Sequence, residues 1–380
     1  MSNSGTTGSV MLAAGGTGGH LFPAYALAEE LARRGIAVDL MTDMRGDRYG
    51  TGFPARKIYQ VPAATMSGSS PLAAARTIFT LARGVRAAGR ILAEVKPGAV
   101  IGFGGYPSFP PIVAASLKGI PTALHEQNAV LGRANRLLAR RVTAIATSFE
   151  TVKLLEGPAA AKARFTGNPV RDAVIAQAAT PYQPSLPGEP FRLLVFGGSQ
   201  GARFFSESVP PALRLLPEHL QARLSVVQQA RPEDEAALTA AYRPEDGTTP
   251  EIAAVISSFF PNLPELMAAS HLVIGRAGAS TVAELAVLGR PSILVPLPHA
   301  LDNDQLANAT RLAAAGGAVC LEQKDTTPER LAAEIARCME APETLAATAA
   351  EARRQGRPDA VHRLADLVLE LMAGVATRAA

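Results

Sequence analysis

The sequence predicts an α/β protein with two doubly wound domains, each built on a parallel sheet. Apolar runs of strand length alternate with amphipathic helical patterns along the whole chain, which is typical of such sheets. A strand-like run also ends in a glycine-rich turn twice, at residues 9–20 and 191–202. Because one hydrophobic core rarely serves as many as 380 residues, we expect each glycine turn to open its own domain.

In the first half, the glycine turn leads into an amphipathic helix at 21–34, which Gly35 closes. A further helix is expected at 129–140, after a polar turn. The strands expected in this half all lie on short apolar runs, at 9–14, 36–41, 99–103, 121–125 and 143–147.

The second half restarts at residue 191, after a connector at 180–190 that contains four prolines. Its strands are expected at 191–196, 224–228, 271–275, 291–295 and 317–321. A final helix carries one apolar stripe, but its periodicity does not say which domain it covers. The stripe consists of Val361, Leu364, Val368, Leu371 and Met372.

The composition argues against several classes of protein. The two cysteines, Cys320 and Cys338, lack metal-site spacing, so we expect ordinary reduced thiols. The first residues lack the basic and apolar segments of an export leader, so we expect no export. The uncharged stretch 97–117 is broken by glycines and prolines that would leave backbone groups unpaired in lipid. We therefore expect no membrane span there.

The first glycine turn does not match the common nucleotide-binding motifs. Leu21 stands where the dinucleotide fingerprint needs its third glycine, and the lysine of a P-loop is absent. The turn still allows its backbone to approach a phosphate, and His20 stands at its exit. An imidazole there is suited to take a proton from an attacking hydroxyl, but a structural histidine is an equal alternative. The turn before His20 is formed by Gly15, Gly16, Thr17, Gly18 and Gly19.

Polar segments follow two further strands of the first half. Gly104, Gly105 and Tyr106 come after the strand at 99–103, and residues 125–128 read His-Glu-Gln-Asn. Side chains at the carboxyl end of a parallel strand are well placed for ligand contacts. A capped turn that opens the following helix would also explain the second segment.

The second half and its junction carry three more candidates. Arg171 lies at the junction and suits a diphosphate or a surface ion pair. Thr281 and Glu284 have the spacing of a capping box, although a carboxylate there can instead accept bonds from both hydroxyls of a ribose. The segment 302–308 contains an Asp-x-Asp but looks more like a polar ligand-binding loop than a metal site.

The net charge of +4 is unevenly distributed. Four arginines fall on one helical face of segment 71–97, close to the apolar residues Leu72, Phe79 and Leu81. This face is either simply solvated or rests on an anionic membrane surface. Scarce aromatic residues and the lack of a recognised motif argue against nucleic acid. The arginines are Arg76, Arg83, Arg86 and Arg90.

Taken together, these segments resemble glycosyltransferase family 28, and within it the bacterial N-acetylglucosaminyltransferases that convert lipid I to lipid II in peptidoglycan synthesis. The resemblance implies the GT-B fold, two Rossmann-like domains facing a cleft. It implies an acceptor and membrane-associating domain at 1–170, joined by the helix 357–380, and a UDP-GlcNAc domain at 171–356. The matching segments are 15–20, 104–108, 125–128, 167–171, 197–202, 276–284 and 302–308.

The resemblance also implies roles for single residues, with His20 as the catalytic base and Glu126 as the next candidate. Asp304 departs from the family pattern, which has Gln or His there. The implied acceptor-binding residues are Gly15, Gly16, Gly104, Gly105, Tyr106 and His125. The implied donor-binding residues are Thr17, Gly18, Gly19, Asn128, Arg171, Ser199, Gln200, Ala279, Ser280, Thr281, Glu284, Asp304, Gln305 and Asn308.

The implied reaction is an inverting transfer of GlcNAc from UDP-GlcNAc to the 4-hydroxyl of MurNAc in undecaprenyl-linked lipid I. We expect no metal and no other cofactor, because this fold neutralises the leaving diphosphate with arginine and helix dipoles. The resemblance implies a peripheral enzyme at the cytoplasmic face of the bacterial inner membrane. Its implied processes are cell-wall synthesis, cell shape and cell division, and its implied protein partners are other cell-wall and division proteins. A transferase with another lipid acceptor, a UDP-GlcNAc 2-epimerase and a membrane-surface scaffold are the alternatives.

Overall fold

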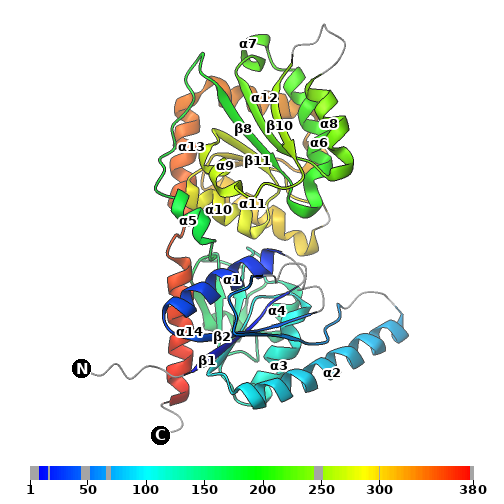
Figure 1. Ribbon diagram of the computed structural model, residues 1–380, viewed down its shortest axis with the longest axis vertical. Helices are drawn as coiled ribbons and strands as arrows, with labels where there is room; N and C mark the ends of the chain where they lie inside the picture. The colour runs from blue at the N-terminus through cyan, green and yellow to red at the C-terminus, as the bar shows by residue number, and fades with distance from the viewer. Residues whose placement is uncertain are drawn as a thin grey trace, which may run out of the picture. The chain divides into compact units, whose positions relative to one another are not determined.

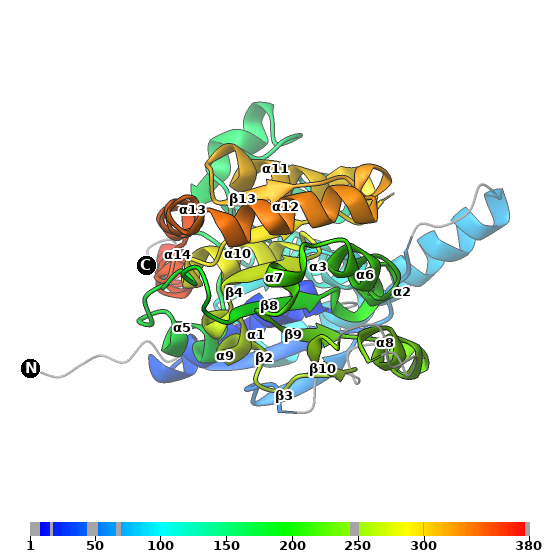
Figure 2. The ribbon, with the colours of Figure 1, turned by 90° about the horizontal axis from the view of Figure 1, so that it is seen from above.

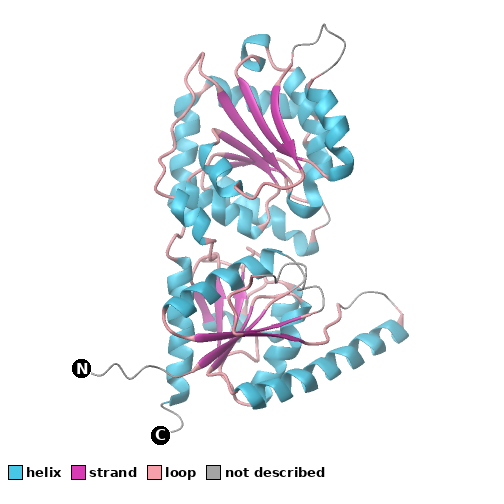
Figure 3. Cartoon of the chain, in the orientation of Figure 1, coloured by secondary structure: helices cyan, strands magenta, loops and turns pink. Residues whose placement is uncertain are grey.

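The computed structural model divides the chain into two compact units, Met1–Arg171 with Arg357–Ala380, and Asp172–Gly356. Each unit is a parallel sheet with helices on both faces (Figure 1, Figure 3). The predicted fold class of two doubly wound α/β domains is therefore confirmed. The structure describes residues 8–15, 18–43, 52–65, 70–243, 251–298 and 300–376.

The first unit has a sheet in the order β3-β2-β1-β4-β5-β6-β7, with all neighbours parallel. The strand order reverses between β1 and β4, and open α/β sheets bind ligands beyond the carboxyl ends of their strands at such a point. The strands are β1 (Ser9–Ala13), β2 (Ala37–Thr42), β3 (Lys57–Gln60), β4 (Ala99–Gly102), β5 (Thr122–Glu126), β6 (Ala144–Thr147) and β7 (Ala163–Phe165).

Two separate cores cover the faces of this sheet. Helices α1 and α14 pack on one face, and α2, α3 and α4 on the other. The stripe of the final helix thus packs against α1 and β4, where Leu364 and Val368 are fully buried. The helices are α1 (Gly18–Arg33), α2 (Pro71–Val95), α3 (Phe109–Leu117), α4 (Arg133–Leu138) and α14 (Ala360–Ala376).

The second unit repeats the same arrangement with the order β10-β9-β8-β11-β12-β13 and its reversal between β8 and β11. Figure 2 shows the strands and helices of this unit from another side. Its strands are β8 (Phe191–Phe196), β9 (Leu224–Gln229), β10 (Ala253–Ser257), β11 (Leu272–Gly275), β12 (Ser292–Leu294) and β13 (Ala318–Cys320). Its helices are α5 (Asp172–Gln177), α6 (Gly198–Arg214), α7 (Glu218–Gln221), α8 (Glu235–Tyr242), α9 (Leu263–Ala269), α10 (Ala279–Leu288), α11 (Asp304–Ala314), α12 (Pro328–Glu340) and α13 (Pro342–Gln355).

All expected strands are present, with ends that shift by no more than one residue. The sequence analysis missed β3, β7 and β10, which are edge strands. Their side chains are mostly exposed or half-buried, so they lack the continuous apolar run of a central strand. The helix expected at 129–140 was wrong in extent: it shrinks to α4, because the amides of Asn128 and Gly132 bond the Glu126 side chain instead.

Candidate functional site

The reversal point of the first sheet brings His20 against two glycines. His20 lies in the first turn of α1, directly after β1, while Gly104 and Gly105 follow the neighbouring strand β4. Both glycines have positive φ, 83° and 67°, which other residues rarely adopt. A Cβ at Gly104 would lie 3.2 Å from His20 Cε1, and one at Gly105 3.3 Å from Cδ2. Glycine is therefore what allows this backbone to lie against the imidazole.

A chain of hydrogen bonds links the Gly167 carbonyl to His125, Gln127 and finally the ring of His20. Carbonyl groups in this chain can only accept, so they determine which atom donates in each bond. The Gly167 carbonyl can only accept, so His125 donates from Nε2 over 3.1 Å and its Nδ1 is left to accept. Gln127 Nε2 donates to this Nδ1 at 3.0 Å and to the Phe103 carbonyl at 2.9 Å. The Gln127 Oε1 then accepts from His20 Nδ1, 3.3 Å away. His20 Nδ1 therefore carries the proton, and Nε2 keeps its lone pair.

Both histidines are neutral at pH 7. Burial lowers the pKa of His20 below its ordinary value of 6.5, against the opposing effect of its bonds to Gln127 and Phe103. The helix N-terminus also disfavours a positive imidazole. Burial lowers the pKa of His125 to about 4. A neutral imidazole that is protonated on Nδ1 has a lone pair on Nε2, the proton acceptor that a general base needs.

The carboxylate of Glu126 is committed to the turn that follows β5. Its Oε1 accepts from the Asn128 backbone amide at 3.0 Å and from Asn128 Nδ2 at 3.4 Å. Its Oε2 accepts from the Gly132 amide at 2.9 Å and from Asn135 Nδ2 at 2.8 Å. Burial raises the pKa of Glu126, and these four bonds oppose the rise. The geometry thus favours His20 over Glu126 as a base and gives Glu126 the role of ordering the loop.

The other predicted residues of the first unit lie around the same strand ends. Gly18 and Gly19 open α1, and Tyr106 follows Gly105 in a short 3₁₀ turn. A Cβ at Gly15 would lie 2.9 Å from Thr42 Oγ1, so a larger residue would displace its neighbours. The Arg171 guanidinium lies 4.9 Å from the centre of the Phe22 ring. Gly16 and Thr17 lie outside the described residues.

The sequence analysis assigned no individual role to three buried amide side chains near this site, although it offered the segment 125–128, which contains Gln127, for ligand contacts. Gln127 links His125 to His20 in the hydrogen-bond chain. Its position directly after an apolar strand was the signal in the sequence that could have indicated this role. Asn135 holds Glu126 from the turn of α4. Asn168 is buried, with 5% of its surface exposed, and neither polar atom of its side chain has a hydrogen-bond partner among the residues that the structure describes. An unpaired buried amide is costly, so Asn168 is a further place for a water or a ligand atom.

The second sheet places two helix N-termini at its own reversal point. Helix α6 begins at Gly198 after β8, and α10 begins at Ala279 after the neighbouring strand β11. Such helix ends favour an anion. The side chains of Ser199 and Gln200 are outside the described part of the chain.

The capping-box interpretation of Thr281 and Glu284 was wrong. The N-cap of α10 is Gly278, so Thr281 already lies inside the helix. Ser280 and Glu284 lie one turn apart on one face of α10, and Glu284 is 5% exposed. Ser280 Oγ is buried without a hydrogen-bond partner among the described residues. This face therefore presents an unused hydroxyl beside a carboxylate.

Polar side chains at the start of α11 form hydrogen bonds with the backbone of neighbouring loops. The loop residues Asp302 and Asn303 both have positive φ, 56° and 53°. The Leu297 amide donates to Gln305 Oε1 at 3.0 Å, and burial raises the pKa of Asp304. Asn308 is fully buried, and its Nδ2 donates to the Ala277 carbonyl at 3.1 Å.

A buried arginine beside this loop was not singled out from the sequence. The Arg276 guanidinium donates to the carbonyls of Val295 and Pro296 at 3.1 and 3.2 Å, and it lies 5.1 Å from the ring centres of Phe204 and Phe205. Burial lowers its pKa to about 10, so it stays charged at pH 7. A buried cation held by neutral groups, next to the start of α10, is preorganised for an anionic ligand.

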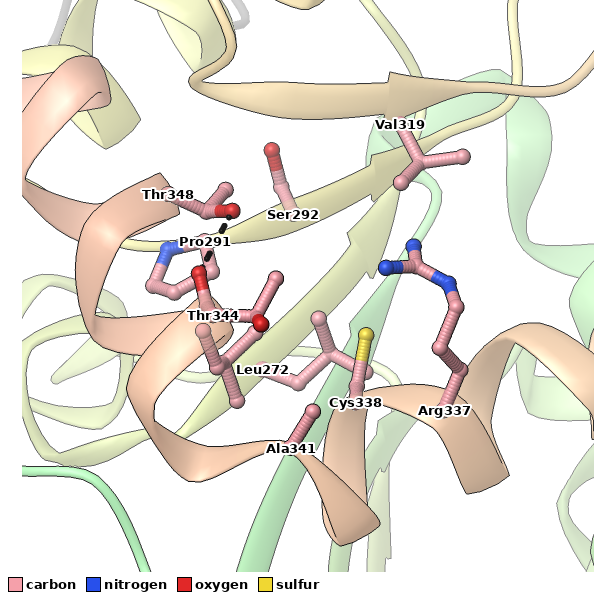
Figure 4. Close-up of a pocket in the computed structure, with 10 residues that line it drawn as sticks. Leu272, Pro291, Ser292, Val319, Arg337, Cys338, Ala341, Thr344 and Thr348 are labelled. Atoms are coloured by element: carbon pink, nitrogen blue, oxygen red, sulfur yellow. Dashed lines mark hydrogen bonds between the residues drawn. The ribbon is translucent and has the colours of Figure 1, made fainter.

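The structure offers neither cysteine as a reactive group. Both thiols are free, and burial raises the pKa of Cys338 to about 11, so this thiol is protonated. Figure 4 shows Cys338 in a cavity of about 20 Å³ that Leu272, Ser292 and Thr348 also line. That volume holds one water. Among the described residues, no group of three or more His, Cys, Asp or Glu side chains is placed to hold a metal ion.

Two Rossmann-like units with phosphate-type turns define the GT-B class of glycosyltransferases. The chain belongs to glycosyltransferase family 28: the family's N-terminal domain matches residues 10–147 and its C-terminal domain residues 192–364.

Individual relatives agree over nearly the full length. A protein from Methylobacterium sp. (strain 4-46), named UDP-N-acetylglucosamine–N-acetylmuramyl-(pentapeptide) pyrophosphoryl-undecaprenol N-acetylglucosamine transferase, is 55% identical over 97% of this chain and 98% of its own. The crystal structure of Acinetobacter baumannii MurG has a TM-score of 0.78 at 30% identity and covers 96% of this chain and 99% of its own. A UDP-GlcNAc 2-epimerase from Neisseria meningitidis has a TM-score of 0.66 at 16% identity over 95% of this chain and 100% of its own, a likeness of fold alone.

Proposed function

We propose that this protein transfers GlcNAc from UDP-GlcNAc to the 4-hydroxyl of MurNAc in lipid I, giving lipid II for peptidoglycan synthesis. Membership of the family and the names of relatives that are 50–55% identical support the substrates. The observation that carries the chemistry is the neutral His20, whose hydrogen-bond chain leaves Nε2 as the base.

In this mechanism the first unit binds the acceptor. Its glycine turns, including Gly15, Gly104 and Gly105, lie against the acceptor's diphosphate through their backbone. His20 Nε2 takes the proton of the MurNAc 4-hydroxyl as the oxygen attacks the anomeric carbon of GlcNAc. The proton ends on His20, and the imidazolium then releases it to solvent.

The second unit binds the donor. As the new C–O bond forms, the bond to UDP breaks and UDP leaves with the electron pair. The N-termini of α6 and α10, together with the buried Arg276, stabilise the negative charge on the leaving diphosphate, and no metal is needed. Glu284 binds the ribose hydroxyls.

We also propose that the enzyme rests peripherally on an anionic membrane, at the cytoplasmic face of the inner membrane. None of the described helices is both long and apolar enough to cross a bilayer. The start of α2 projects from its unit (Figure 1, Figure 2), and the exposed fractions of Leu72, Ile78 and Phe79 there are 70%, 64% and 65%. The arginines at 76, 83, 86 and 90 are also exposed on this helix. Apolar side chains flanked by arginine suit a lipid headgroup region.

The test of the main proposal follows label from UDP-GlcNAc into a short-chain lipid I analogue, with UDP measured in the same reaction. The expected result is labelled lipid in a 1:1 ratio with UDP. Release of UDP or of an epimerised sugar without labelled lipid would overturn the proposal.

A further inference from the structure

A groove of about 630 Å³ lies in the first unit at the amino-terminal ends of β5, β6 and β7. The end of α3 and the last turns of α14 complete its walls. The His20 site lies at the opposite, carboxyl ends of these strands. Strand β5 runs from Thr122 at the groove to Glu126 at that site, about 13 Å at the usual rise per residue. The groove is thus separate from the proposed acceptor site.

The groove carries excess positive charge. Arg141, Lys162 and Arg164 line it, and Glu370 is the one acid among the described lining residues. Lys162 is held by neutral groups, since its Nζ donates to the carbonyls of Arg140 and Val142 at 2.9 and 2.8 Å. The guanidinium groups of Arg141 and Arg164 are exposed, and neither forms a salt bridge within the described chain. These two groups are therefore available to an anion.

An apolar wall stands in the same groove. Ile120, Leu367 and Leu371 line it, and the two leucines are only 7% and 9% exposed because α14 packs on the sheet. The groove therefore combines an apolar patch with charged and polar groups in a volume of several hundred Å³, as small-molecule sites do. The combination calls for a ligand with one anionic end and one apolar end.

We propose that this groove binds an anionic amphiphile, with a phosphate or carboxylate held by Arg141 and Arg164 and an alkyl or acyl chain laid against Ile120, Leu367 and Leu371. Two guanidinium groups suit such a head because each donates two parallel hydrogen bonds to its oxygens. The ligand is either a bilayer lipid or a soluble amphiphile of the same chemistry. This inference does not depend on the proposed transferase activity.

The test is calorimetric titration of the full chain with octyl phosphate below its micelle concentration, in the presence of saturating UDP to occupy a diphosphate site. We expect saturable 1:1 binding that weakens two- to fourfold for each methylene removed from the chain. Inorganic phosphate and the neutral octyl glucoside should each bind at least tenfold more weakly. The R141S/R164S double variant should lose at least tenfold in affinity, since it removes two charge-assisted contacts.

The matched control is Arg243→Ser, which removes an exposed arginine from the second unit and should leave octyl phosphate binding unchanged. Sedimentation with vesicles containing phosphatidylglycerol separates the two sources of ligand. Weaker vesicle binding by R141S/R164S than by R243S supports a bilayer lipid, and unchanged vesicle binding with lost octyl phosphate binding supports a soluble ligand. No octyl phosphate binding, equal binding of octyl glucoside, or equal affinity in R141S/R164S and R243S would overturn the proposal.

Discussion

Gln127 is predicted to set the tautomer and the basicity of His20 without touching substrate, which makes it a positioning residue. In Gln127→Met, His20 Nδ1 loses the acceptor 3.3 Å away, and this neutral hydrogen bond is worth about 0.5–1.5 kcal/mol. The equilibrium between the two neutral tautomers of His20 then shifts by up to about tenfold away from the form protonated on Nδ1. We expect kcat to fall about tenfold, with the acid limb of the pH–rate profile moving to lower pH, because the Gln127 bond that is lost raises the pKa of His20.

Gln127→Glu places a carboxylate beside the same nitrogen. It still accepts from His20 Nδ1, but its charge favours the imidazolium and should raise the pKa of His20 by about 1–3 units. Activity at high pH should then stay within about tenfold of wild type, while the acid limb moves to higher pH by at least one unit. The two variants therefore separate tautomer control from charge.

The assay is kcat and kcat/KM for sugar transfer between pH 5 and 10, with melting temperatures measured alongside. In a His20→Ala background neither substitution at 127 should lower kcat further, because residues that act as a unit are not additive. Equal losses for Q127M and Q127E with superimposable pH profiles would show that Gln127 only packs, and would refute the tautomer argument.

The remaining predictions concern the base, the fold and the membrane. His20→Ala should lower kcat by about 10²–10⁴ with little effect on the donor KM, and the acid limb of wild-type kcat/KM should lie below pH 6.5, because burial lowers the pKa of the base; a tenfold or smaller loss would reassign the base. Gly84→Ala should lower the free energy of unfolding in urea by about 1–3 kcal/mol, because a Cβ at this position would lie 2.1 Å from the Pro62 carbonyl oxygen. In the control Gly89→Ala, the new Cβ would lie 3.7 Å from its nearest atom, so the free energy of unfolding should rise or stay unchanged. Burial would raise the pKa of Glu30, but its bonds to Arg33, Arg34 and His362 outweigh burial and lower this pKa from 4.5 to about 2. The ionised Glu30 should therefore add up to roughly 3 kcal/mol to the free energy of unfolding above pH 4.5, and this contribution should be lost as pH falls toward 2. In E30Q, the free energy of unfolding should change less over that pH window. The I78S/F79S variant should sediment at least tenfold less with anionic vesicles while its kcat on a soluble acceptor analogue is unchanged; undiminished sedimentation would move the membrane contact away from α2.

The fold was predictable because its signals are local. A buried parallel strand is a short apolar run, and the sequence shows such a run for each central strand. Edge strands β3, β7 and β10 were missed because half of their surface faces water and their pattern is that of a loop. The extent of α4 was wrong for a different reason: a side chain from the preceding strand, Glu126, captures the amides that the helix needed.

The site was predictable only as positions at strand ends. Parallel topology places His20 and Gly104 together, so their neighbourhood followed from the strand order. The direction of the hydrogen-bond chain did not, because it depends on the Gly167 carbonyl, 42 residues after His125. The supporting roles of Gln305 and Asn308 likewise depend on loop contacts with Leu297 and Ala277 that no spacing reveals.

Product analysis by ¹H NMR tests the central claim most directly. UDP-GlcNAc, in which the sugar is α-linked, is incubated with a short-chain lipid I analogue and the anomeric protons are followed. A single base at His20 requires direct displacement, so we predict one new β-1,4-linked GlcNAc for each UDP released. An α-linked product, or UDP-ManNAc without any glycosylated lipid, would contradict the account.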